Sequence, residues 1–281
     1  MNDQAKPGEI MSVKPPTEPQ NDRRFSQTTA VVTGASSGIG RATAVALAYA
    51  GAAELVIHYR SNRQGAEETA EAVRGAGAEA TIVSGDLADA ADVDRICEES
   101  FRRLGVIHTW VNNAGADVLT GDSASMTFDE KVRLLFDVDV LGTIRLSRAA
   151  ASRMRLQATE LPSSMTLIGW DQAPAGMEGD AGQMFGPVKA AVMAFSASLA
   201  QTVAPKIRVN TVSPGWIRTS WGESTDAYWD RRAQRQSLMG RWGTPDDVAR
   251  AIAYVATPAN TFMSGAVLEV NGGWNRAFPA E

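Results

Sequence analysis

The sequence has few of the residues that bind metals or form disulfides. It contains one cysteine, Cys97, and two histidines, His58 and His108, among 281 residues. A single cysteine excludes a disulfide within the chain and a cluster of cysteine ligands around a metal. Both histidines lie in or beside apolar, strand-like segments, which argues against a histidine metal site or a Ser-His-Asp triad. We therefore expect no metal centre.

Excess basic charge and long apolar runs are also missing. The formal net charge is -5, so a surface for nucleic acid or anionic lipid is not indicated. No apolar run is long enough to cross a bilayer. Residues 1–27 are rich in proline and polar residues and lack the apolar block of a signal peptide. We expect a flexible leader over 1–27, one domain over 28–281, and a cytoplasmic protein.

Apolar runs typical of buried strands alternate with helical patterns along the rest of the chain. Seven strands are expected within residues 29–32, 54–59, 79–85, 108–115, 164–170, 206–215 and 265–273. Helical patterns cover residues 39–51, 65–77, 91–105, 128–155, 184–205 and 244–257. Repeated β-α-β units imply right-handed crossovers. We predict an α/β fold, a single-domain doubly wound (Rossmann) parallel sheet of about seven strands with helices on both faces.

A glycine-rich turn follows the first predicted strand. Residues 33–40 read TGASSGIG, and a helical pattern starts within them. Gly34, Gly38 and Gly40 leave room for a ligand to approach the backbone, and the first amides of the helix point at the turn. This arrangement binds a pyrophosphate, so we predict a dinucleotide site. The alternative interpretation is a tight turn without a ligand.

Five segments together resemble the short-chain dehydrogenase/reductase family. They are TGASSGIG, Asp86-Leu87 in SGDLAD, the NNAG of residues 112–115, the SPG of residues 213–215, and the closing GAVLEVNGG, and the resemblance runs from about Thr29 to Trp274. It implies cofactor-binding residues in each segment. These are Gly34, Ser36, Ser37, Gly38, Ile39 and Gly40 near the phosphates, Asp86 and Leu87 near the adenine, Asn113, Ala114 and Gly115 near the ribose, and Pro214, Gly215, Ile217 and Thr219 near the nicotinamide.

The residues after the second predicted strand favour NADP(H) over NAD(H). NAD-binding sheets commonly place an acid there to bind the ribose hydroxyls. Here the position holds Tyr59, followed by Arg60 and Ser61, so no carboxylate would repel a 2′-phosphate. The Arg60 guanidinium offers a planar pair of donors to such a phosphate. Alternatively, Arg60 and Arg63 are solvated surface charges.

The family's catalytic motif, Tyr-x-x-x-Lys, is altered in this chain. It reads Phe185-Gly186-Pro187-Val188-Lys189. Lys189 remains, and in the family this lysine also binds the nicotinamide ribose, so its presence fits either catalysis or binding alone. Phe185 has no hydroxyl and cannot transfer a proton. Protonation of a reacting oxygen by the usual route is therefore not expected.

Two further catalytic positions of the family are also changed. Asp139 occupies the place of the family's asparagine. Gly169 or Trp170 occupies the place of its serine, and Asp171 follows directly. We name Lys189, Asp139 and Asp171 as candidate catalytic residues, with Phe185 at the usual tyrosine position. For the two aspartates the alternative is a structural carboxylate that binds backbone amides or water.

Two hypotheses about function remain open at this point. The first is an NADP-dependent oxidoreductase with changed chemistry, which reduces a C=N bond or a conjugated C=C bond. An iminium group needs no proton donor during hydride addition, and a nearby acid such as Asp139 or Asp171 would stabilise its positive charge. The second is a catalytically inactive NADP-binding sensor or partner protein.

The segment 216–242 is expected to form a lid over the substrate. It contains Trp216, Trp221, Trp229 and Trp242, which indicates an apolar small-molecule substrate, unless these rings only pack the lid. The helical segments that begin near Phe128 and Phe185 are apolar around much of their circumference. Family members usually pair these helices, so the resemblance implies a homodimer or homotetramer.

Overall fold

The computed structural model describes residues 24–275, in which seven parallel strands form one sheet. The strands are β1 (Thr29–Val32), β2 (Glu54–Tyr59), β3 (Glu79–Ser84), β4 (Thr109–Asn112), β5 (Ser163–Ile168), β6 (Ile207–Pro214) and β7 (Val267–Val270). Their order is β3-β2-β1-β4-β5-β6-β7. The order reverses between β1 and β4, and ligands of such sheets bind at this reversal. The predicted fold class is confirmed.

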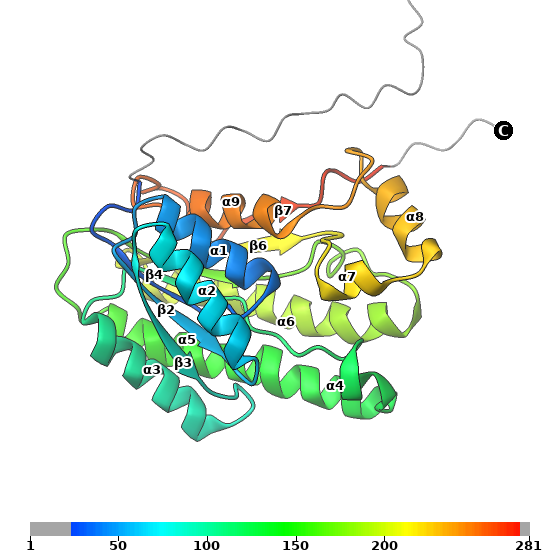
Figure 1. Cartoon of the computed structure of the whole chain (residues 1–281), viewed down its shortest axis with the longest axis horizontal. Coiled ribbons are helices and arrows are strands. Elements are labelled where there is room, and N and C mark those ends of the chain that lie inside the picture. The colour runs from blue at the N-terminus through cyan, green and yellow to red at the C-terminus, as the bar shows by residue number, and fades with distance from the viewer. Residues whose placement is uncertain (1–23, 276–281) are drawn as a thin grey trace, which may run out of the picture.

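Helices cover both faces of the sheet (Figure 1). One face packs against α1 (Gly38–Tyr49), α2 (Arg63–Gly75) and α9 (Pro245–Ala256). The other packs against α3 (Ala90–Leu104), α5 (Thr143–Met154) and α6 (Gly179–Val203). Within β1, the Val31 side chain belongs to the hydrophobic core on the side of α3, α5 and α6. Ala30 and Val32 belong to the core on the side of α1, α2 and α9. This alternation follows from the period of two along a strand and explains why the buried strands are continuously apolar.

The predicted helix 128–155 is interrupted in its middle. It consists of α4 (Phe128–Leu135), a π-helical segment (η2, Phe136–Gly142) and α5. Asp139 lies in the π-helical segment and is buried. The prediction of one regular helix was wrong here, because the apolar pattern carries no signal for a change in turn size. π-helical turns occur often at functional sites.

Helix α6 begins five residues earlier than the predicted segment 184–205. Gly179 has φ +81°, and a Cβ on Gly182 would lie 1.9 Å from the carbonyl oxygen of Met177. The close approach at Gly182 therefore requires glycine. The helix also contains Pro187. Three glycines and a proline near its start are not typical of a helix, so packing against the sheet outweighs local propensity.

Residues 24–27 were predicted to be part of a leader, but they are ordered against the domain. Phe25 is fully buried, and its N–H donates a hydrogen bond to the carbonyl oxygen of Ala50 (2.9 Å). Residues 24–27 thus belong to the folded domain, whereas residues 1–23 lie outside the described residues. Of the helices in residues 24–275, none is long and apolar enough to span a bilayer.

Candidate functional site

Two adjoining cavities open beside the carboxyl ends of the central strands. The first, which we call the polar chamber, has a volume of about 500 Å³ and lies at the reversal between β1 and β4. The second, which we call the apolar chamber, has a volume of about 390 Å³. Residues lining both chambers are Ile39, Leu119, Phe185, Lys189 and Thr219. A molecule that fills both chambers would therefore pass Phe185 and Lys189.

The glycine turn forms one wall of the polar chamber. Gly34 and Gly38 have positive φ angles (+61° and +53°), and a Cβ on Gly34 would lie 2.7 Å from the Cα of Ala114. Ser37 at the start of α1 makes no side-chain capping bond, and the first turn has no acidic residue. The first amides of α1 therefore remain available to an anion. Gly40 does not line the chamber; a Cβ there would lie 2.3 Å from the Gly34 oxygen.

Most of the other residues predicted to bind the cofactor line the two chambers. Ser36, Ser37, Ile39, Arg60, Ser61, Asp86, Leu87, Asn113, Ala114 and Gly115 line the polar chamber, and Pro214, Gly215, Ile217 and Thr219 line the apolar chamber. Asn113 also holds the turn, because its Nδ2 donates to the carbonyl oxygens of Thr33 (3.0 Å) and Gly34 (3.1 Å). Its amide is therefore already engaged by the protein.

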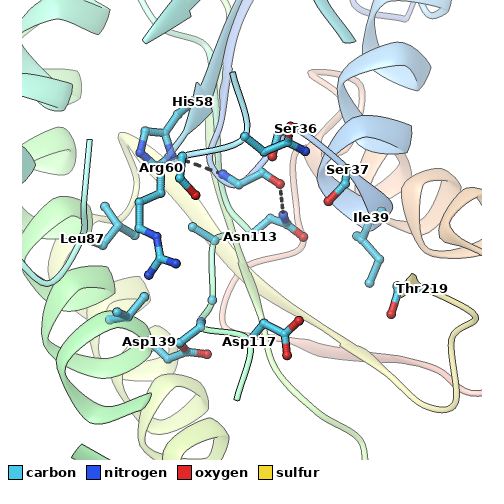
Figure 2. A pocket seen from close by; sticks show the side chains of 18 of the residues that line it. Ser36, Ser37, Ile39, His58, Arg60, Leu87, Asn113, Asp117, Asp139 and Thr219 are labelled. Carbon is cyan, nitrogen blue, oxygen red and sulfur yellow. Dashed lines mark hydrogen bonds between the residues drawn. The ribbon is translucent and has the colours of Figure 1, made fainter. Parts of the chain in front are cut away.

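The end of β2 presents arginine to the polar chamber. Tyr59 is buried and does not line the chamber. The exposed Arg60 does line it, and in Figure 2 its guanidinium extends between Leu87 and Asn113. Within residues 24–275 the Arg60 guanidinium forms no hydrogen bond or ion pair. Arg63 instead pairs with Glu67 (2.8 Å) and lies outside the chamber.

His58 is a site residue that sequence reasoning missed. Its Nδ1 accepts a hydrogen bond from the Gly34 N–H (3.2 Å), and its Nε2–H donates to the carbonyl oxygen of Gly85 (3.1 Å). Burial lowers its pKa to about 4, so the ring is neutral. His58 thus joins the glycine turn to the end of β3. The available signal was a histidine among the apolar residues of β2, directly before Tyr59.

Lys189 and Asp139 form an ion pair at the junction of the chambers. The Lys189 Nζ lies 2.9 Å from the Asp139 Oδ2, and the side chains are 17% and 3% exposed. The other carboxylate oxygen, Oδ1, accepts a hydrogen bond from the Ala116 N–H (2.8 Å). A Cβ on Gly115 would lie 2.8 Å from the Asp139 Oδ2. Asp139 lines only the polar chamber, whereas Lys189 reaches both.

Phe185 lies in α6, four residues before Lys189. Its ring meets the ring of Trp170 edge to face, with centroids 6.5 Å apart. Gly169 and Trp170, the residues at the expected serine position, also line the apolar chamber. Ser163 and Ser164 lie at the opposite end of β5. Thr219 is the hydroxyl-bearing residue among those that line the apolar chamber.

Asp171 lies outside both chambers. It is buried, and its Oδ2 accepts a hydrogen bond from the Asn271 Nδ2 (3.1 Å). The chain turns after Trp170, so the carboxylate lies behind Gly215 rather than facing a ligand. The expectation that Asp171 stabilises a bound substrate is not supported by this position. Burial raises the pKa of Asp171 to about 6, against the opposing effect of the Asn271 hydrogen bond.

We expect His58 and Asp171 to affect the pH dependence of stability in opposite directions. The unfolded chain binds more protons at His58 between pH 6.5 and about 4, so stability falls as the pH decreases through this range. The folded chain binds more protons at Asp171 between pH 6 and about 4, so stability rises. Each shift is worth about 3 kcal/mol.

Urea unfolding at pH 7, 5.5 and 4.5 tests this expectation. As the pH falls, the free energy of unfolding of His58→Gln should decrease less than that of the wild type. The free energy of unfolding of Asp171→Asn should decrease more than that of the wild type. Absolute stabilities of the two variants will differ from the wild type, so only the slopes against pH are compared. Parallel slopes for all three proteins would contradict both assignments.

The lid segment 216–242 contains α7 (Ser220–Ser224) and α8 (Ala227–Gln236). Trp216, Trp229 and Trp242 line the apolar chamber. The side chain of Trp221 lies outside what the structure describes. Tyr228, a conceivable replacement for the missing phenol, is 54% exposed and is not among the lining residues. The lid thus contributes aromatic carbon surface, and no tyrosine hydroxyl, to the chamber in the part of the chain that the structure describes.

Comparison with known proteins agrees with the observed fold. Residues 34–275 match the family described as Enoyl-(Acyl carrier protein) reductase. The chain is 33% identical to the 3-oxoacyl-acyl-carrier-protein reductase FabG of Escherichia coli, over 89% of this chain and 98% of the relative. It is 32% identical to 3beta-hydroxysteroid dehydrogenase 1 of Eggerthella lenta, over 87% and 92%. A short chain dehydrogenase from Burkholderia cenocepacia, solved in complex with NADP, aligns with a TM-score of 0.79 at 27% identity, over 89% and 98%.

Proposed function

Because this chain belongs to the short-chain dehydrogenase/reductase family of oxidoreductases, we propose that it reduces a conjugated C=C bond of an apolar small molecule with NADPH. The observation that carries this proposal is the pair of residues at the junction of the chambers. Phe185 offers no acidic hydroxyl, whereas Lys189 offers a positive charge. The site is therefore suited to stabilising negative charge without transferring a proton at the same moment.

The polar chamber fits the adenosine and phosphate part of NADPH. The positive-φ glycines and the uncapped start of α1 suit a diphosphate. Arg60 suits the additional 2′-phosphate, and no carboxylate follows β2 directly. Pro214, Gly215 and Thr219 would hold the nicotinamide end beside Lys189. When bound, NADPH supplies a hydride.

Replacing Arg60 should weaken NADPH binding selectively. We expect Arg60→Ala to raise the Kd for NADPH about tenfold or more, since a charge-assisted hydrogen bond contributes about 1.5–3 kcal/mol. The Kd for NADH should change less than twofold. Arg63→Ala is the matched control. It removes a neighbouring arginine that pairs with Glu67 and lies outside the polar chamber. Calorimetry with both nucleotides measures these values, and equal weakening of NADPH and NADH would refute the role of Arg60.

The charge of the apolar chamber favours a conjugated C=C bond over a C=N bond. Hydride addition to the β carbon of an enone moves the C=C electron pair toward the carbonyl and leaves negative charge on its oxygen. Lys189 is a cation that can stabilise this charge. An iminium group would need an unpaired anion in the chamber, but Asp139 lines only the polar chamber and is paired with Lys189 (2.9 Å), and Asp171 lines neither chamber.

The chamber also favours an enone over a saturated ketone. Hydride addition to a simple ketone leaves a localised alkoxide, which must be protonated as it forms. An enolate is delocalised, and water can protonate its α carbon in a later step. Phe185 cannot provide the concerted proton. The proposed reaction therefore needs only what the residues present can supply.

A substrate panel tests the proposed function. The protein with NADPH is mixed with cyclic enones, the corresponding saturated ketones and cyclic imines, and the absorbance of the reduced nicotinamide is followed. We expect kcat/KM for the enones to exceed that for the ketones by at least 100-fold, which is the lower range for loss of a positioned acid. Faster reduction of the ketones would contradict the proposal. Tight NADPH binding without reduction of any substrate would favour an inactive NADP-binding protein.

A further inference from the structure

The aromatic side chains that line the apolar chamber come from two separate parts of the chain. Trp170 follows β5 and Phe185 lies in α6, so both belong to the body of the domain. Trp216, Trp229 and Trp242 come from the lid segment. The centroid of the Trp216 ring lies 5.8 Å from that of Trp229 and 6.0 Å from that of Trp242. The three lid tryptophans thus form one cluster.

Hydrogen bonds fix the polar edges of two lid tryptophans. The Trp216 Nε1–H donates to the Gln236 Oε1 (2.8 Å), and the Trp242 Nε1–H donates to the Asp230 Oδ1 (2.8 Å). Both acceptors belong to α8. Because these donors are already satisfied, the two indoles offer a ligand mainly aromatic carbon surface.

Arginine side chains stack on the same rings. The Arg232 guanidinium lies 5.8 Å from the Trp216 ring centroid and 5.3 Å from that of Trp229, and it pairs with Glu178 at the start of α6 (3.0 Å). The Arg218 guanidinium lies 5.4 Å from the Trp242 centroid. These contacts hold the rings in place before any ligand enters.

We propose that the apolar chamber selects a flat, fused-ring substrate over a flexible chain of the same size. Rings that are already fixed lose little freedom when they stack on a rigid planar ligand, whereas an alkyl chain loses rotamer freedom at every bond. The volume of about 390 Å³, part of which the nicotinamide end would occupy, lies in the range of small-molecule pockets. The identity of the reacting bond depends on the proposed function above, whereas the selection by shape does not depend on it.

Binding of two ligands with thirteen carbons each tests this selection. The probes are 9-fluorenone, which is flat and tricyclic, and 3-tridecen-2-one, which is an open chain. Calorimetry on the full chain saturated with NADP should give a Kd for fluorenone at least about tenfold lower. Trp229→Leu in the lid segment and Trp170→Leu in the body of the domain should each raise the fluorenone Kd about tenfold and change the tridecenone Kd less than twofold.

Trp274→Leu is the matched control, because Trp274 is half-buried and is not among the residues that line the chamber. It should change neither Kd. Equal affinity for the two probes, or equal weakening of both by the chamber variants, would overturn the proposal. If one chamber variant fails to fold, the other provides the same comparison. Selective fluorenone binding by a protein that reduces no enone would contradict the proposed reaction and leave the shape selection supported.

Discussion

Phe185→Tyr should turn the protein into a reductase of saturated ketones. The substitution adds one hydroxyl four residues before Lys189, at the position that we interpret as that of the family's proton donor. Phe185 already lines both chambers beside Lys189, so the new phenol would face the ligand. A positioned general acid contributes about 10²- to 10⁴-fold. We expect kcat/KM for cyclic ketones to rise at least about 100-fold, as measured by oxidation of NADPH.

Phe185→Leu is the control for this experiment, because it changes the ring without adding a hydroxyl. It should leave ketone reduction at the wild-type level. The pH profile provides a second readout, since activity that depends on a phenol should acquire a new ionisation absent from the leucine variant. If the tyrosine variant binds NADPH normally and still reduces no ketone, Phe185 is not what prevents ketone reduction.

Lys189→Met should abolish most enone reduction and destabilise the fold. Removal of one group that stabilises an oxyanion typically lowers kcat by about 10²- to 10³-fold. Removal also leaves the buried Asp139 carboxylate without its partner at 2.9 Å. Breaking a buried ion pair from one side costs about 3–5 kcal/mol. Steady-state kinetics and urea unfolding measure the two effects separately.

The double variant Lys189→Met with Asp139→Asn separates stability from catalysis. An asparagine retains an oxygen for the Ala116 N–H but carries no charge. The double variant should therefore regain most of the stability that Lys189→Met loses, whereas its rate of enone reduction should stay low. Recovery of activity together with stability would show that Lys189 acts only through the fold. Lys189→Arg keeps the positive charge and should retain more activity than the methionine variant.

The sequence was sufficient to predict the sheet and the glycine turn that forms one wall of the polar chamber. The turn at Gly34 and Gly38 combines a preceding apolar strand, fixed glycine spacing and a following helix, which are all local signals. The different positions of Arg60 and Arg63 could not be predicted from the sequence, because they depend on the direction in which each side chain leaves the backbone. Only the structure shows Arg60 in the chamber and Arg63 on Glu67.

The remaining features depend on contacts between distant segments. His58 becomes important through Gly34 and Gly85, which lie 24 and 27 residues away along the chain. Asp171 was expected beside a substrate because it follows the serine position, but the turn after Trp170 carries it to Asn271 instead. A single sequence without spatial information does not distinguish these placements.

The π-helical segment holds more residues per turn than a regular α-helix. Neighbouring residues of an α-helix are separated by about 100° around the axis, and in the wider turn this angle is smaller. The wider turn therefore absorbs an extra residue without turning α4 relative to α5, and Leu135 of α4 and Leu146 of α5 are both fully buried. Asp139 lies inside the wide turn, where it pairs with Lys189. Deleting one residue from Phe136–Gly142 should thus leave the two helices in phase but change the direction of the Asp139 carboxylate.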